Sequence, residues 1–427
     1  MRIDPTALLS AAVESQLLRP PLNHTFLEGN IDRRPNLERR HLRVQDGLGR
    51  LMKVTLGAGL KPLLDRADAF HAAVPDNSPA TRFFLHSEEG DVWAQDWIEG
   101  PSCERPIHDL PTAVDTISAL DRLETALEAT AQASARAEWE TELEEWSRSM
   151  IELPVWTPSE QLYLQRKLAP WLRDILRPTS PRHRWSNGDF FSGNLKLPSE
   201  RVVLLDLEYG RRTHFYLEDP VRFLRLSPIA HRHPGLFAGL WPEMSPPWEI
   251  FFQLRQLALE LAVNTPEYLT REVPLRKAYL RFSFEAGGLD AREWSEASRP
   301  PPPEFAKETV QLFWQTGDGP WSETDSRRIE VRRGEKQFVA FRIPTNAKRL
   351  RLDPTASIRP AVINAVGTID AAGKFQNCSI QITAAGAELN QTPEGLHVLP
   401  HTTDAQLFIP FSSPATFLIA EIFVFEK

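Results

Sequence analysis

The sequence predicts an α+β fold in two parts, a mixed sheet-and-helix region followed by an all-β sandwich of jelly-roll type. Hairpin-like pairs of short strands precede residue 101, and helical periodicity dominates from residue 109. The composition then changes at a run of four prolines, residues 300–303. Beyond it, short apolar runs alternate with Gly, Pro, Asn and Asp, a pattern typical of a sandwich.

Composition places the chain among folded globular proteins with more than one core. Its 427 residues exceed one ordinary domain, and 41% are hydrophobic while 25% are charged. The formal net charge of -8 argues against a nucleic-acid partner, because affinity for the phosphate backbone comes from a surplus of Lys and Arg. We therefore expect no nucleic-acid partner.

Cysteine usage and hydropathy favour a cytoplasmic protein. The two cysteines, Cys103 and Cys378, form neither a disulfide framework nor a CxxC metal motif, so a reducing compartment is expected. Met1–Pro5 lacks a secretory apolar segment, and we expect no transmembrane segment because no apolar run is long enough.

The first hundred residues predict a helical extension and a small antiparallel lobe. Residues 1–19 hold a helix from Thr6 to Leu18, and residues 20–100 form the small lobe. Its strands are expected in two hairpins, at residues 41–44 with 51–55 and at residues 82–86 with 92–101. Lys53 lies on the second of these strands.

Residues 101–298 predict a larger, mainly helical lobe. The apolar residues keep helical spacing and should face a core, as in Ala113, Ile117, Leu120, Leu123 and Leu127. Further helices are expected at residues 248–262 and 274–286.

A polar loop inside this lobe carries the candidate chemistry. Asp189 and Asn194 are separated by four residues, and the apolar run Val202–Leu205 ends at Asp206. Such a loop can bring three oxygen-bearing side chains together. Hard cations such as magnesium prefer oxygen ligands, and a carboxylate can accept the proton of an attacking hydroxyl.

The motif resembles the aminoglycoside phosphotransferase and choline kinase branch of the kinase-like fold. The residues that carry the resemblance are Asn187-Gly-Asp189, Asp206-Leu-Glu208 and Glu218-Asp-Pro220. Asn187 departs from the pattern, because His usually precedes Gly-Asp in that family. The resemblance implies a bilobal protein-kinase-like fold and ATP- and magnesium-dependent phosphorylation of a hydroxyl.

The resemblance also implies a role for each candidate site residue. Asp189 would be the catalytic carboxylate, while Asn194 and Asp206 would bind Mg²⁺. Lys53 would contact the ATP phosphates and pair with an acid of the next helix, Asp65 or Asp68. The hinge between the lobes would hold adenine through the backbone around Asp96, Trp97 and Ile98.

Plainer interpretations stand beside this one. Asn-Gly-Asp and Ser-Gly-Asn are ordinary turn sequences, Val-Val-Leu-Leu-Asp fits any buried strand, and Lys53 could face solvent. A kinase-like protein without catalytic activity, which only binds nucleotide or a partner, is the first alternative.

The C-terminal part predicts a Pro-rich linker at residues 299–307 and a β-sandwich at residues 308–427. We expect about eight strands between Arg328 and Phe425, one of them at residues 378–383. Val310–Trp314 and Leu350–Pro354 resemble a module of bacterial surface-polysaccharide enzymes. The resemblance implies a glycan or other small-molecule acceptor and polysaccharide-assembly partners. A carbohydrate-binding scaffold or a plain stabilising domain remains the alternative.

Overall fold

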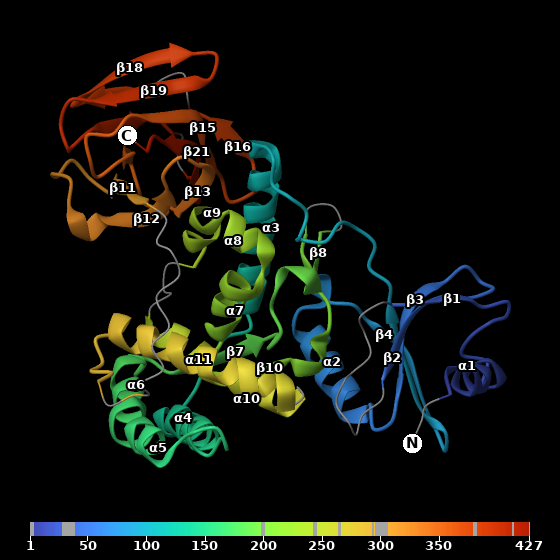
Figure 1. Cartoon of the computed structure of the whole chain (residues 1–427). Helices are drawn as coiled ribbons and strands as arrows, with labels where there is room; N and C mark the ends of the chain where they lie inside the picture. Colours follow the sequence, from blue (N-terminus) through green and yellow to red (C-terminus); the bar gives the residue numbers. More distant parts are fainter. Residues whose placement is uncertain are drawn as a thin grey trace.

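The computed structural model describes residues 4–27, 39–197, 201–241, 246–263, 266–292, 294, 306–378, 382–411 and 414–426. Figure 1 shows a small sheet at one side, helices in the middle and a β-sandwich packed against α8 and α9. The expected order of a small lobe, a helical lobe and a sandwich is therefore confirmed. Within the described residues, no helix combines the length and the apolar character that crossing a membrane requires.

The small lobe is a five-stranded antiparallel sheet in the order β1-β2-β3-β5-β4, flanked by two helices. Its elements are α1 (Pro5–Glu14), β1 (Asn23–Phe26), β2 (Arg40–Gln45), β3 (Leu51–Gly57), α2 (Lys61–Ala73), β4 (Thr81–Ser87) and β5 (Gly90–Asp96). Asp4 caps α1 by accepting a hydrogen bond from the Thr6 amide at 2.9 Å. Leu8, Leu9 and Ala12 of α1 join the sheet residues in one buried cluster.

The large lobe is helical around a small three-stranded sheet, β10-β7-β6. Its helices are α3 (Leu110–Glu128), α4 (Arg136–Ile151), α5 (Pro158–Tyr163), α6 (Ala169–Ile175), α7 (Glu218–Leu226), α8 (Pro228–Arg232), α9 (Pro234–Ala238), α10 (Pro246–Val263) and α11 (Pro266–Ala286). Its strands are β6 (Gln132–Ala133), β7 (Arg182–Ser186), β8 (Leu195–Lys196), β9 (Val203–Leu204) and β10 (Arg211–Thr213). The expected helical periodicity around Leu120 belongs to the buried face of α3.

The C-terminal domain packs two antiparallel sheets face to face. Its strands are β11 (Lys307–Gln315), β12 (Ser326–Arg332), β13 (Lys336–Arg342), β14 (Arg349–Asp353), β15 (Ala361–Ile369), β16 (Phe375–Asn377), β17 (Thr383–Ala385), β18 (Ala387–Thr392), β19 (Gly395–Pro400), β20 (Gln406–Ile409) and β21 (Phe417–Val424). One sheet has the order β12-β11-β14-β20-β17 and the other β13-β21-β15-β19-β18. Side chains from both sheets, such as Leu312 and Phe341, share one core.

One expected strand of this domain needs correction, and the expected linker stays untested. Of the strand expected at residues 378–383, the described residues Cys378 and Ile382 lie outside any strand and Thr383 begins β17. The strands on either side belong to different sheets, because β16 pairs with β15 and β17 pairs with β20. Residues 299–305 of the expected linker at residues 299–307 lie outside the described residues. The last residue of that range, Lys307, is the first residue of β11.

The sandwich and the large lobe share a hydrophobic core. Phe338, Ala340 and Phe417 of the sandwich lie in the same buried cluster as Leu236 and Phe237 of α9. A Cβ atom added at Gly239, directly after α9, would lie 1.5 Å from the Ala340 carbonyl oxygen. The two backbones can approach this closely only because residue 239 has no side chain.

This close approach predicts that Gly239→Ala destabilises the whole chain. The added methyl group must push α9 away from β13, at a cost of about 1–3 kcal/mol of unfolding free energy. We expect the midpoint of thermal unfolding to fall by several degrees. Gly317→Ala is the matched control, because no heavy atom lies within 4 Å of the added Cβ. Equal midpoints for both variants would contradict the packing of α9 on β13.

Candidate functional site

The turn that follows β7 is held by a buried carboxylate of α7. Asp219 accepts hydrogen bonds from the amide of Asn187 at 2.7 Å and from the amide of Gly188 at 3.0 Å. Gly188 has φ of 73°, and a Cβ there would lie 2.7 Å from the Tyr209 carbonyl oxygen. The turn therefore requires glycine at residue 188 and an acceptor at residue 219.

Asn187 braces the same turn with its side chain. Its Oδ1 accepts from the Asp189 amide at 3.1 Å, and its Nδ2 donates to the Leu205 carbonyl oxygen at 3.4 Å. The residue is fully buried. Asn187 therefore links the backbone of Asp189 to the strand that leads to Asp206.

Asn194 joins Asp189 in one hydrogen-bonded unit. The Asn194 Nδ2 donates to Asp189 Oδ2 at 2.9 Å and to the Asp189 carbonyl oxygen at 3.1 Å. The Leu205 amide donates to the Asn194 carbonyl oxygen at 2.8 Å. The amide nitrogen of Asn194 is thus engaged, which leaves its Oδ1 as the atom available to a cation.

Arg222 of α7 is a site residue that the sequence analysis missed. Its Nη1 donates to Asp189 Oδ1 at 3.1 Å, although the residue is only 4% exposed. Within the described part of the chain, its buried Nε and Nη2 have no hydrogen-bond partner. Sequence spacing could have indicated this residue, because Arg222 follows Asp219 by three residues and so lies on the same face of the helix.

Burial and charge act on Asp189 in opposite directions. Burial raises the pKa of Asp189 above its ordinary value, and the negative charge of Asp206 adds to that rise. The Arg222 guanidinium and the hydrogen bond from Asn194 oppose it. The net result is a raised pKa, which makes Asp189 a better proton acceptor than an exposed aspartate once it is ionised.

Lys53 of the small lobe forms an ion pair with Asp206 of the large lobe. Burial alone would raise the pKa of Asp206, but the charge and hydrogen bond of Lys53 outweigh it and the pKa is lowered. Asp206 has left-handed backbone geometry, with φ of 51°, at the start of the turn after β9. The ion pair therefore links the two lobes electrostatically at this site.

The acid expected beside Lys53 on the following helix is not there. Asp65 pairs with Lys61 on the exposed surface of α2, and Asp68 accepts from Thr81 Oγ1 at 2.5 Å. Leu64 and Ala67 take the buried face of α2 instead. The structure brings Lys53 to Asp206 and places Asp65 apart from both.

The hinge segment after β5 has two of its amides engaged. The Asp96 amide donates to the Ala80 carbonyl oxygen at 2.9 Å, and the Trp97 amide donates to that of Leu51 at 3.3 Å. The next amide, at Ile98, has no backbone partner among the described residues. Asp96 pairs with Arg82, so its side chain is also engaged. The role of residues 96–98 in holding adenine stays a prediction, with Ile98 as the available donor.

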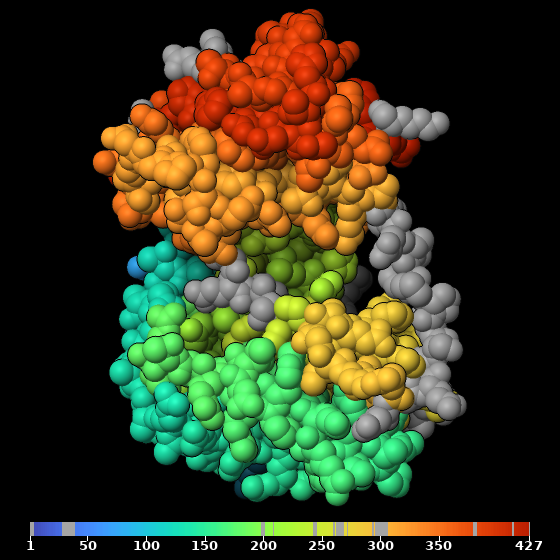
Figure 2. All heavy atoms as spheres, turned by 90° about the vertical axis from the view of Figure 1, so that its left-hand side faces the viewer, coloured from blue at the N-terminus to red at the C-terminus, as the bar shows by residue number. Residues whose placement is uncertain are grey.

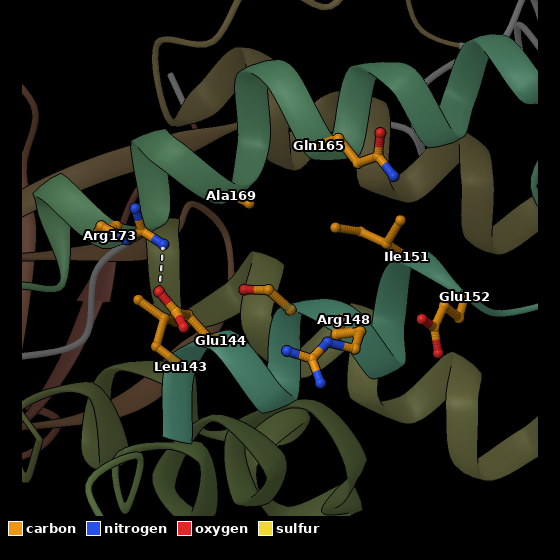
Figure 3. Close-up of a pocket in the computed structure, with 9 residues that line it drawn as sticks. Leu143, Glu144, Arg148, Ile151, Glu152, Gln165, Ala169 and Arg173 are labelled. Carbon is orange, nitrogen blue, oxygen red and sulfur yellow. Dashed lines mark hydrogen bonds and ion pairs between the residues drawn. The ribbon is translucent and has the colours of Figure 1, made fainter. Parts of the chain in front are cut away.

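Two pockets of the large lobe lie apart from this cluster. One of about 280 Å³ lies between α4 and α6, where Arg173 pairs with Glu144 at 3.1 Å (Figure 3). Another, of about 830 Å³, is lined by α7, α10, α11 and Glu330 of β12. The space-filling view shows a hollow between the sandwich and the helical lobe on this side (Figure 2). None of their lining residues is Lys53, Asp189, Asn194 or Asp206.

Comparison with known proteins gives similar structures but no similar sequence. No protein-family model and no curated protein matches the sequence. The solved aminoglycoside-3'-phosphotransferase of type VIII is 18% identical, with a TM-score of 0.39, over 59% of this chain and 97% of that one. Aminoglycoside phosphotransferase APH(4)-Ia is 14% identical, with a TM-score of 0.43, over 65% of this chain and 99% of that one.

A third similar structure is spectinomycin phosphotransferase, APH(9)-Ia, in complex with ADP and spectinomycin. It is 9% identical, with a TM-score of 0.41, over 67% of this chain and 93% of that one. At such low identities and TM-scores, what these proteins bind is not transferred to this chain. The kinase-like fold class expected from the sequence agrees with the two lobes and the loop geometry described above. The resemblance of residues 308–427 to polysaccharide-enzyme modules stays a prediction.

The dependence of the loop on Asp219 predicts a large effect of Asp219→Ala. The change leaves two buried amides without an acceptor, at a cost of about 1–3 kcal/mol each. We expect Asp219→Asn to lose less, because its Oδ1 still accepts one of them. Denaturant unfolding of both variants measures the difference, with the exposed Asp65→Ala as control. An Asp219→Ala protein as stable as the control would show that the two amides find another acceptor.

Proposed function

We propose that this protein transfers a phosphoryl group from ATP to a hydroxyl group of a small molecule or glycan. The observation that carries the proposal is the meeting of Lys53, Asp189, Asn194 and Asp206. Lys53 pairs with Asp206, Asn194 donates to Asp189, and the charge of Asp206 acts on Asp189. Lys53 thus contacts a residue more than a hundred positions later in the chain, and this contact supports the proposal.

Lys53 is proposed to bind the phosphates of the nucleotide. Its ammonium group is mostly buried, with 16% of the side chain exposed, and it already lies beside a carboxylate at the junction of the lobes. Adenine would lie at the hinge, where the Ile98 amide is available as a donor. A nucleotide bound this way would bridge β3, β5 and the large lobe.

The donor set of Asn194 and Asp206 fits magnesium. Asn194 offers its Oδ1, because its nitrogen is taken by Asp189, and Asp206 is held ionised by Lys53. Carboxylate and amide oxygens are the ligands that Mg²⁺ accepts. The ion would supply charge neutralisation on the phosphates, while the chain supplies the fixed positions of these oxygens.

Asp189 is proposed to orient the acceptor hydroxyl and accept its proton. Its backbone is fixed by Asn187, and its carboxylate is held by Asn194 and Arg222. Arg222 opposes the effect of burial on the pKa of Asp189 and so favours the ionised form of the carboxylate. We propose a glycan as acceptor on the resemblance of the sandwich alone, with polysaccharide-assembly proteins as partners and the cytoplasm as the location.

A nucleotide-binding protein without transfer activity is the second candidate. The contact that favours it is the ion pair of Arg222 with Asp189, because a carboxylate engaged by a buried cation is a weaker base. Asn187 in place of the usual His points the same way. The two candidates differ in one measurable property, which is transfer that depends on Asp189.

Variants at Asp206 and Asp189 separate binding from transfer. We expect ATP with Mg²⁺ to raise the midpoint of thermal unfolding of the wild type, and Asp206→Asn to lose that rise because a charged metal ligand is gone. Asp189→Asn should keep it but lower ADP release with an acceptor by about a hundredfold or more. The acceptor screen covers sugars, lipid-linked glycans and small alcohols.

Two outcomes would contradict the transfer proposal. A stabilised wild type with ADP release unchanged in Asp189→Asn would favour the binding protein. No response to ATP in the wild type would reject both candidates and leave the scaffold interpretation. Asp65→Asn is the matched control, because its carboxylate pairs with Lys61 on the surface.

The contact between Arg222 and Asp189 predicts a shift in the pH profile of transfer. Arg222→Gln removes the cation that lowers the Asp189 pKa, so the ionised form is lost at a higher pH. We expect the acid limb of kcat/KM to move to higher pH, with little change well above it. Arg225→Gln is the control, because Arg225 pairs with Glu249 and not with Asp189. A lower rate at every pH with an unmoved acid limb would reduce Arg222 to a packing role.

A further inference from the structure

A second cluster of ligating side chains lies on the sheet that precedes the catalytic loop. His183 belongs to β7, and His214 directly follows β10. Arg184 pairs with Thr213 across these antiparallel strands, so His183 and His214 are the next cross-strand neighbours. Their ring centroids are 5.7 Å apart. Glu138 of α4 completes the set, and the nearest ligand atoms of the three residues all lie within 4.8 Å of one another.

A neighbouring carboxylate holds the His214 ring in a ligating tautomer. Glu142 Oε2 lies 2.5 Å from His214 Nδ1, and Ser134 Oγ lies 2.7 Å from Nε2. Because an ionised carboxylate only accepts, the proton belongs on Nδ1, and Nε2 presents a lone pair that the Ser134 hydroxyl now meets. A carboxylate behind the ring is the usual partner of a metal-bound histidine.

Glu142 is itself fixed to the strand that carries the ring. It accepts a hydrogen bond from the His214 amide at 3.0 Å and another from Thr213 Oγ1. Glu138 lies one helical turn before Glu142, so both acids of α4 face the end of β10. The nearby arginines form ion pairs with carboxylates outside this cluster. Arg182 pairs with Glu128, and Arg211 lies 3.9 Å from Glu218.

We propose that Glu138, His183 and His214 bind one divalent transition-metal ion of the zinc class. Two imidazole nitrogens and one carboxylate suit zinc, whereas magnesium prefers an all-oxygen set. Tetrahedral zinc needs ligand atoms about 3.3 Å apart. The ligand atoms, which lie within 4.8 Å of one another, must therefore move closer together. Rotation of the exposed Glu138 side chain and displacement of the Ser134 hydroxyl from His214 Nε2 would allow this.

The bound ion would tie α4 to β7 and β10. These two strands lie directly before and after the segment that carries Asp189 and Asp206. β7 ends three residues before Asp189, and β10 begins five residues after Asp206. The site shares no residue with the proposed nucleotide and magnesium site. Its role is therefore structural support of the loop, and its occupancy can be tested whether or not the protein transfers phosphate.

Metal binding by the full-length protein tests this site. Protein stripped with a chelator is titrated with Zn²⁺, and the retained metal is measured by mass spectrometry after dialysis. We expect one tightly bound equivalent and a higher midpoint of thermal unfolding. His183→Ala and His214→Ala should each weaken binding at least tenfold. Co²⁺ should give the visible absorption of a site with nitrogen ligands.

The exposed His401 supplies the matched control, and His401→Ala should bind as the wild type does. Glu138→Gln serves if a histidine variant fails to fold, because the Glu138 side chain is exposed and its replacement should not disturb the fold. We expect this variant also to weaken binding. Unchanged affinity in folded His183→Ala and His214→Ala, or no retained zinc in the wild type, overturns the proposal.

Discussion

The hydrogen bonds from the Asn187 and Gly188 amides to Asp219 are the constraint on which the rest of the site depends. They fix a turn that contains a left-handed glycine, and that turn sets the direction of Asp189. Asn187 then carries the constraint to Leu205, one residue before Asp206. On the other side, the buried Arg184 anchors β7 to Glu124 and Glu128 of α3. The loop is therefore held from α3, α7 and β9 together.

The site also combines two ion pairs with different consequences. Lys53 and Asp206 join the two lobes, and a bound cation would compete with Lys53 for the same carboxylate, so nucleotide and metal binding should alter the contact between the lobes. Arg222 and Asp189 lie within the large lobe, where the guanidinium is almost fully buried. Removing one partner of such a pair leaves an uncompensated charge, which costs more than losing a surface pair.

The sandwich packs directly on the large lobe. Its strands β13 and β21 contribute Phe338, Ala340 and Ile419 to the cluster that contains Leu236 and Leu240 of the large lobe. Arg342 of β13 also pairs with Asp121 of α3. The two parts differ in composition, but composition reflects local structure and does not show whether their surfaces pack.

The sequence by itself determined the local features of this protein. The hairpins around Lys53, the helical face of Leu120 and the order of Asp189, Asn194 and Asp206 follow from turn residues and from apolar spacing. Only the tertiary structure decided the partners. It set Lys53 against Asp206 rather than Asp65 and brought Arg222 to Asp189. It also placed β16 and β17 in different sheets and aligned His183 with His214. The physical reason is range, because periodicity acts over a few residues whereas these contacts depend on how whole elements pack.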